Sequence, residues 1–247
     1  MSDPRTVATG IEIRPVLPAG NEERFVGYGV MAQPFASGHL LALRRFPATS
    51  VGPAYTSIWH RDPELNWTFR ITGKPMECCN RYFGSIVDET MRVAIDLQWV
   101  SPNQLTISTA DGQIQWSVAL APSPTTRVLS RTAGLIPDVL WRQPFMPAMT
   151  GAMAGSMLRV GRMKMHGAVP NGQEFRMNPP QVWSVSGTQA TVNGVDLGPA
   201  GPLRLQDNLA DFWLPQRGLF YAGSVLFERY TEERHRLVSN RSGTPGV

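Results

Sequence analysis

The chain has 247 residues, of which 42% are hydrophobic and 17% charged, and its formal net charge is +4. This is the balance of a globular protein with a sizeable core, and it excludes a disordered or fibrous chain. The basic residues are scattered without a run of five or six, so we expect no nucleic-acid partner. No apolar run reaches the ~18 residues of a membrane span and no apolar signal-peptide core occurs, so we expect a soluble, cytoplasmic protein of unknown oligomeric state.

The two cysteines, Cys78 and Cys79, are adjacent. A disulfide between neighbours is strained and rare, so the pair does not indicate a disulfide framework. The four histidines are dispersed and have no zinc-ligand spacing relative to the cysteines. We therefore expect no metal and no cofactor.

The first part of the chain predicts an irregular lead-in over residues 1–24 and then a strand at His39–Arg44. Tyr55–His60 and Trp67–Thr72 are both rich in aromatic and β-branched residues. Between them, residues 61–66 hold the Asp, Pro and Asn that are typical of a turn. This stretch therefore predicts a β-hairpin.

The middle of the chain alternates apolar and polar residues, first over Met91–Trp99 and again over Ile114–Leu120. Leu105 and Ile107 continue the apolar face between them, and Asp111-Gly112 is a hairpin signal. These segments predict three consecutive antiparallel strands, a meander.

Further along, Met149, Met153 and Met157 are spaced by four residues, which predicts one helical insertion at about 135–158. Strands are expected again at 161–166, 174–177, 182–185, 190–195 and 219–230, and a helical turn at 206–213. The fold class is therefore mainly β: an antiparallel meander closing into a lipocalin-like barrel or a strongly curved sheet. Residues 25–230 would form this single domain, and 231–247 a flexible tail.

The predicted hairpin has two faces of different character. Alternation places Tyr55 and Trp59 on one face, together with Trp67 and Phe69 of the partner strand. It places His60 and Arg70 together on the opposite face. A histidine near an acid suits general acid–base work, because its pKa lies close to neutral pH.

A second group of reactive side chains lies in residues 74–84. It holds Lys74, Glu77, the two cysteines and Tyr82. A buried lysine can form a Schiff base, and a cysteine beside an arginine can ionise. The upstream Gly52-Pro53-Ala54-Tyr55 resembles a stretch of acetoacetate decarboxylases, but the lysine motif of that family is absent and we do not assign the chain to it.

Four segments carry a resemblance to lipocalin-like, calycin-type proteins: WHRDPELNWTFR, MRVAIDLQWV, LTISTADGQIQWSVAL and RMKMHGAVPNGQEF. In particular the chain resembles the carotenoid-hydratase and AttH-like group, which implies a β-barrel acting on isoprenoid or polyketide-like apolar substrates. The Trp-x-Asp-His-like signature of that group is absent, so no catalytic residue is carried over. The chain is also similar to uncharacterised proteins of GC-rich bacteria.

The sequence therefore predicts binding of a small apolar molecule (lipid, isoprenoid or polyketide-like) in a barrel cavity. The lining would come from Trp59, Trp67, Phe69, Trp99, Trp116, Met149, Met153 and Met157. The alternative is a cofactor-independent enzyme (isomerase, cyclase, hydratase or decarboxylase) in the same cavity. Its candidate catalytic residues are His60, Asp62, Glu77 and Lys74 as acids or bases, and Tyr55 and Tyr82 as donors. A protein–protein interaction module would instead show an exposed apolar patch and no cavity.

Overall fold

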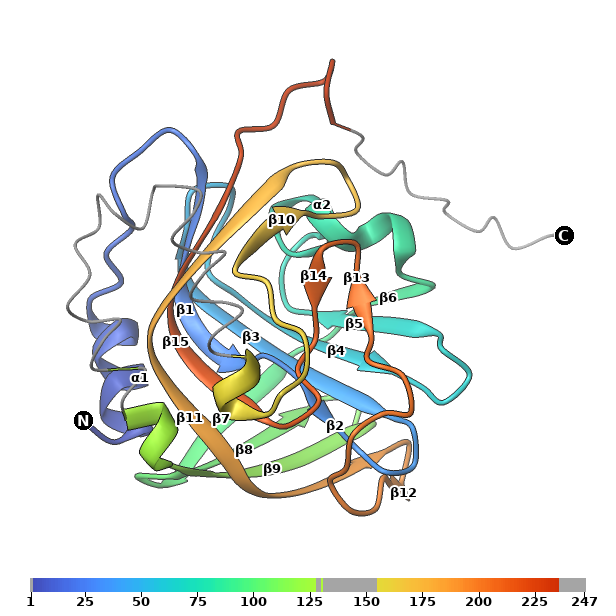
Figure 1. Cartoon of the computed structure of the whole chain (residues 1–247). Helices are drawn as coiled ribbons and strands as arrows, with labels where there is room; N and C mark the ends of the chain where they lie inside the picture. The colour runs from blue at the N-terminus through green and yellow to red at the C-terminus, as the bar shows by residue number, and fades with distance from the viewer. Residues whose placement is uncertain (1, 128–129, 131–154, 236–247) are drawn as a thin grey trace, which may run out of the picture.

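One curled β-sheet organises the chain in the computed structural model, which describes residues 2–127, 130 and 155–235 (Figure 1). Ten strands follow one another across the sheet, and the predicted hairpin and meander are confirmed as antiparallel neighbours within it. In spatial order the strands are β6 (Glu89–Arg92), β5 (Trp67–Ile71), β4 (Tyr55–Arg61), β3 (Leu40–Thr49), β1 (Glu23–Val30), β15 (Leu219–Phe227), β11 (Glu174–Val192), β9 (Ile114–Ala121), β8 (Gln104–Thr109) and β7 (Ile95–Ser101).

Strand β11 turns the sheet from one half into the other. Its first part pairs with β15 and its second part with β9, and the register shifts between Asn178 and Gln181 and again between Val185 and Gly187. The first shift contains two prolines, which cannot donate to a strand ladder, and bulges of this kind bend a strand. The sequence segments expected as three separate strands between 174 and 195 are therefore one long, bent strand.

The two ends of the strand order lie close together in the chain. Only Val93 and Ala94 separate β6 from β7. The Val93 N–H donates to the Ile71 carbonyl at 3.0 Å, while the Ala94 carbonyl accepts from Ala110 N–H at 2.9 Å. Because two residues span little more than ~7 Å, the sheet must curl until its edges nearly meet. The predicted strongly curved, mainly β fold is confirmed.

The curl divides the interior into two cores. The barrel core lies inside the curl and joins β3 and β4 to β8 and β9; Trp99 of β7 contacts Phe220 of β15 across it, with ring centroids 5.9 Å apart. The loop-covered core lies on the other face of β1, β3, β4 and β5. It is covered by η1 (Pro75–Glu77), α2 (Asn80–Phe83), η2 (Gly84–Ile86), β10 (His166–Ala168), β13 (Asn208–Leu209) and β14 (Phe212–Trp213), several of which Figure 1 shows in front of the sheet. Two short strands, β2 (Gln33–Pro34) and β12 (Val195–Asp196), pair with β3 and β11.

The N-terminal segment differs from the expected irregular lead-in, because it contains the helix α1 (Pro4–Ile13). The Asp3 side chain accepts from Thr6 N–H at 2.9 Å, and Pro4 occupies the first helical turn. Both features favour a helix start. The helix buries Ala8 in the barrel core, and the Arg45–Glu12 ion pair at 2.8 Å ties it to β3.

Two further expectations are corrected. The segment 206–213 forms the β13–β14 hairpin and not a helical turn, with Ala210 at a φ of 57°. The strand expected at 161–166 begins only at His166. Of the predicted helical insertion, residues 155–158 are helical and the rest, 135–154, lies outside the described residues. In the described part of the chain, no helix has the length and apolar character to cross a bilayer.

Candidate functional site

The two faces of the β4–β5 hairpin lead to two different spaces, and the predicted catalytic residues are divided between them. His60 and Asp62 line an opening at one end of the barrel core. Tyr55 and Tyr82 line a small cavity in the loop-covered core. The prediction that His60 and Arg70 share a face is confirmed, because both line the first space.

The opening, which we call the barrel mouth, has a volume of about 480 Å³. One wall is formed by β4, β5 and β6, and the other by the turns after β8 and β11. The residues that give it chemical character are His39, His60, Asp62, Arg70, Glu89 and Gln113. Apolar side chains of the barrel core close its floor, among them Val192 and Leu197.

Two histidines meet at the barrel mouth. The β3–β4 register pairs Leu41 with His60, so His39 lies diagonally across from His60 on the same face. Nδ1 of His39 and Nε2 of His60 are 3.0 Å apart, and the ring centroids are 5.2 Å apart. Burial, with the charges of His39 and Arg70, lowers the pKa of His60 to about 4, and burial also lowers the pKa of His39. Both rings are therefore neutral near pH 7 and share one hydrogen between them.

Arg70 enters the barrel mouth from β5 with unused hydrogen-bond donors. It is 3% exposed, and its Nη2 donates to Oε1 of Gln113 at 2.5 Å. Its Nε and Nη1 are buried and have no hydrogen-bond partner among the described residues. The Asp111 carboxylate lies 3.8 Å from Nε, which is an ion pair but too long for a hydrogen bond. Burial of the guanidinium lowers the pKa of Arg70.

The charge at the barrel mouth is mixed. With neutral histidines, the cation of Arg70 stands against the carboxylates of Asp62 and Glu89. Asp62 accepts from the backbone and side-chain N–H groups of Asn66, both at 2.8 Å. Burial raises the pKa of Asp62, but these two bonds outweigh it and leave the pKa below its ordinary value. Asp62 therefore holds the turn as an anion, and the mouth favours a ligand without net negative charge.

The depressed pKa of His60 predicts a pH-dependent stability. Its folded pKa of about 4 lies below the ordinary 6.5, so the unfolded chain binds more protons between these values. The stability that neutral His60 contributes is fully present above pH 6.5 and is lost as the pH falls towards 4, by up to about 3 kcal/mol. Urea unfolding at several pH values should show this slope, and His60→Gln should flatten it. An unchanged slope in the variant would show that His60 titrates normally.

The loop-covered cavity is much smaller, at about 30 Å³. Around it lie Tyr55, Trp59, Cys79 and a residue that the sequence reasoning missed, Arg44. Arg44 is 3% exposed and donates to the carbonyls of Val30 at 2.6 Å and of Met31 and Leu43 at 2.9 Å. A basic residue inside the apolar strand HLLALRR was the available signal.

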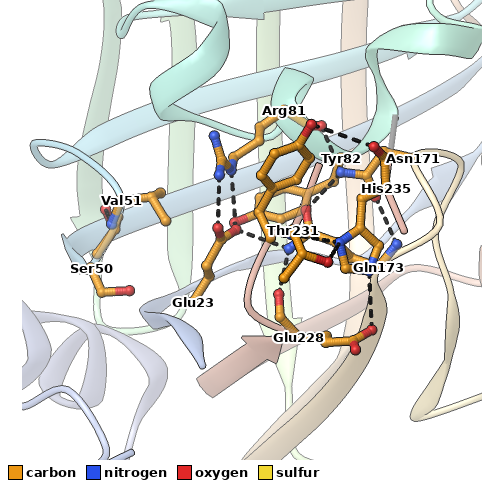
Figure 2. Close-up of polar contacts among 12 residues, drawn as sticks. Glu23, Ser50, Val51, Arg81, Tyr82, Asn171, Gln173, Glu228, Thr231 and His235 are labelled. Carbon is orange, nitrogen blue, oxygen red and sulfur yellow. Dashed lines mark hydrogen bonds and ion pairs between the residues drawn. The ribbon is translucent and has the colours of Figure 1, made fainter. Parts of the chain in front are cut away.

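Tyr82 of α2 takes part in a separate polar network, which joins α2 to Glu23 and Gln173 (Figure 2). Its hydroxyl donates to Glu23 at 2.6 Å, and Arg81 donates to the same carboxylate from Nη2 at 2.8 Å and from Nε at 3.1 Å. Gln173 Nε2 adds a bond at 3.1 Å. Burial raises the pKa of Glu23, but these bonds and the charge of Arg81 outweigh it and lower the pKa overall. The network also reaches His235, which is buried at the start of the predicted tail and contacts Glu228.

Because Arg81, Tyr82 and Gln173 all donate to the carboxylate of Glu23, we expect Glu23→Gln to lower the free energy of unfolding by about 3 kcal/mol, as for a broken buried ion pair. Urea unfolding at pH 7 measures it. Glu22→Gln, a charge change at the neighbouring position, should have an effect within about 0.5 kcal/mol. Equal effects of the two variants would contradict this role of Glu23.

The remaining predicted site residues are not brought together. Lys74 pairs with Glu77 at 3.2 Å and its side chain is 68% exposed, so this pair lies in neither space. Of the predicted aromatic lining, Trp59, Trp67 and Phe69 belong to the loop-covered core. Trp116 belongs to the barrel core, and Trp99 packs against that core. Met157 is exposed. Met149 and Met153 lie outside the described residues. No group of three or more potential metal-ligating side chains occurs within residues 2–127, 130 and 155–235.

No family model and no curated protein matches the chain, so neither comparison confirms the lipocalin-like resemblance. Among solved structures, the acetoacetate decarboxylase of Legionella pneumophila is similar over 90% of this chain and 89% of its own, with 12% identity and a TM-score of 0.41. Another acetoacetate decarboxylase is similar over 90% and 91%, with 10% identity and a TM-score of 0.41. Likeness of this size carries no conclusion about activity, since one fold serves many chemistries.

Proposed function

We propose that the protein is a cofactor-independent isomerase that transfers protons on a small, uncharged carbonyl compound at the barrel mouth. The observation that carries this proposal is the hydrogen-bonded His39–His60 pair, which lines the same 480 Å³ space as the side chain of Arg70. A pocket of this volume with convergent titratable groups of shifted pKa is the usual form of a small-molecule active site.

The histidine pair can act as acid and base at once. When His39 Nδ1–H donates to His60 Nε2, the outer Nε2 of His39 is an acceptor and the outer Nδ1–H of His60 is a donor. When the bridging hydrogen lies on His60 instead, the two outer roles are exchanged. Two neutral rings therefore always offer one base and one acid.

This arrangement suits a keto–enol or double-bond shift. The acceptor nitrogen takes a proton from the carbon next to the carbonyl, the bridging hydrogen moves to the other ring, and the donor nitrogen releases its proton to the substrate. No net charge accumulates on the pair, so the low pKa of His60 does not prevent the reaction. The side chain of Arg70 lines the same space, and its positive charge would stabilise the negative charge that develops on the carbonyl oxygen.

The test is proton exchange. Small 1,3-dicarbonyl compounds, with acetylacetone as the first probe, are incubated in deuterium oxide with the protein, and loss of the exchangeable carbon-bound protons is followed by NMR. We expect exchange above the buffer rate that saturates with probe concentration. Exchange at the buffer rate across neutral 1,3-dicarbonyls, 2-oxo esters and cyclic enones would overturn the proposal.

Binding of a small apolar molecule without chemistry is the second reading. Its support is the aromatic face of the hairpin, where Trp59 stacks on Phe69 with ring centroids 4.5 Å apart. The adjoining cavity of about 30 Å³ is far below the ~300 Å³ of ordinary ligand sites, so a lipid or isoprenoid does not fit in it. Saturable quenching of tryptophan fluorescence by a fatty acid, with no proton exchange on any carbonyl probe, would favour this reading.

A further inference from the structure

The sulfur of Cys79 occupies an unusual place in the loop-covered core. Cys79 is 4% exposed and directly precedes α2, which holds it against the face of β4. The indole Nε1–H of Trp59 points at the sulfur, at 3.3 Å. Cys78 is fully buried beside it and donates to the Pro75 carbonyl at 3.4 Å. A buried thiol is ordinarily a small hydrophobic group, so a donor directed at its sulfur needs another explanation.

The second observation is the cation of Arg44. Its guanidinium carbon lies 4.5 Å from the ring centroid of Trp59, on the side of the sheet that carries Cys79. Backbone carbonyls accept from its two terminal nitrogens, and in the described part of the chain no carboxylate pairs with it. A buried cation without an anion is costly. A thiolate at Cys79 supplies the missing negative charge.

The third observation is the space beside the sulfur. The cavity of about 30 Å³ has room for about two water-sized molecules. Tyr221 lines it, is 1% exposed, and has a hydroxyl without a hydrogen-bond partner among the described residues. A molecule of two oxygen atoms fits the cavity and would give this hydroxyl a partner, whereas a bulky electrophile does not fit.

We propose that Cys79 is a thiolate that reduces hydrogen peroxide in the loop-covered cavity and that Cys78 resolves the product. The sulfur of Cys79 attacks one peroxide oxygen, an S–O bond forms and the O–O bond breaks. The departing hydroxide takes a proton from solvent and leaves as water, so Cys79 is oxidised to a sulfenic acid and the peroxide is reduced. The sulfur of Cys78 then attacks that of Cys79, an S–S bond forms between the two neighbours, and the hydroxyl leaves with the Cys78 proton as a second water. The strain of a disulfide between neighbours makes this bond an easily reduced product and not a structural bridge.

The protonation of the two thiols agrees with these roles. Burial raises the pKa of the Cys79 thiol, but hydrogen bonds from its neighbours, Trp59 among them, and the charge of Arg44 outweigh burial and lower the pKa overall. The interaction with the Cys79 sulfur raises the pKa of the Cys78 thiol, and burial raises it further. Cys79 is therefore the attacking sulfur, and Cys78 keeps its proton until the second step.

The experiment uses the full chain, reduced and then freed of reductant. Hydrogen peroxide is added, samples are then unfolded in urea that contains dimedone, which traps sulfenic acids, and adducts are located by peptide mass spectrometry. In the wild type we expect a mass loss of two hydrogen atoms and little adduct. Cys78→Ser should accumulate the adduct at Cys79, and Cys79→Ser should show neither product. Wild-type thiols that oxidise no faster than those of the urea-unfolded chain would overturn the proposal, as would an adduct at Cys78.

Two further variants test the environment of the sulfur in the Cys78→Ser background. Arg44→Met should slow adduct formation at least about tenfold, because it removes the cation that favours the thiolate. Trp59→Phe keeps an aromatic ring but removes the Nε1–H donor, and it should slow adduct formation several-fold. This variant provides the test if Arg44→Met does not fold. Unchanged adduct rates in a folded Arg44→Met or in Trp59→Phe would contradict the role of the cavity. Proton exchange at the barrel mouth is measured separately, because these residues do not line it.

Discussion

Replacing His60 with glutamine should slow proton exchange on a saturating carbonyl probe by about 100-fold or more, the usual contribution of a general acid or base. Glutamine has a similar length and can still hydrogen-bond to Nδ1 of His39. It cannot pass a proton from one side of its amide to the other, so the relay is broken while the fold is kept. His39→Gln should have an effect of similar size, because each ring depends on the other.

The matched control is His166→Gln on β10, which lies outside the barrel mouth. Its exchange rate should equal that of the wild type. The wild-type rate should be independent of pH near neutrality and should fall once His39 takes up a proton, at a pH below the ordinary 6.5, because the active pair is neutral. A rate that falls already between pH 8 and 7, or a His60→Gln variant with full activity, would remove the pair from the mechanism.

Replacing Arg70 with methionine should separate activity from stability. The exchange rate should fall by about 100-fold, as when a preorganised oxyanion donor is removed. The melting temperature should be unchanged or higher, because Nε and Nη1 are buried without hydrogen-bond partners among the described residues and methionine relieves that cost. The exchange assay and thermal unfolding monitored by circular dichroism measure the two effects.

Arg92→Met on β6 is the control for Arg70→Met, since Arg92 is exposed and does not line the barrel mouth. It should change neither quantity. If Arg70→Met lowers the melting temperature by more than about 5 °C, Arg70 stabilises the fold through Asp111 and Gln113, and its proposed role towards the substrate is contradicted.

The period-two pattern predicted much of the sheet. It placed the β4–β5 hairpin and the pairing of β7, β8 and β9 correctly, because alternation reports which face of a strand is buried. The single strand predicted over Met91–Trp99 was wrong, because that segment is divided between the end of β6 and the start of β7. It did not show that β11 is one strand, because a bulge at Pro179 and Pro180 interrupts the alternation without ending the strand. The start of α1 does have a local sequence signal, because Asp3 is a helix cap and Pro4 a first-turn proline.

The candidate site could be predicted only where a single strand pair decides it. Alternation within one hairpin put His60 and Arg70 on one face. His39 lies beside His60 only because of the register between β3 and β4, and the sequence does not specify that register locally. Likewise, Arg44 and Cys79 share a cavity only because the segment around α2 folds over the sheet, and such a long-range contact leaves no pattern in either segment.

The most direct test of the neutral histidine pair is a nitrogen NMR titration of the ¹⁵N-histidine-labelled protein between pH 8 and 4. We expect that His39 and His60 are both neutral at pH 7 and share one hydrogen-bonded N–H, and that His60 takes up a proton only near pH 4. Titration of His60 near 6.5, with no shared N–H, would contradict it.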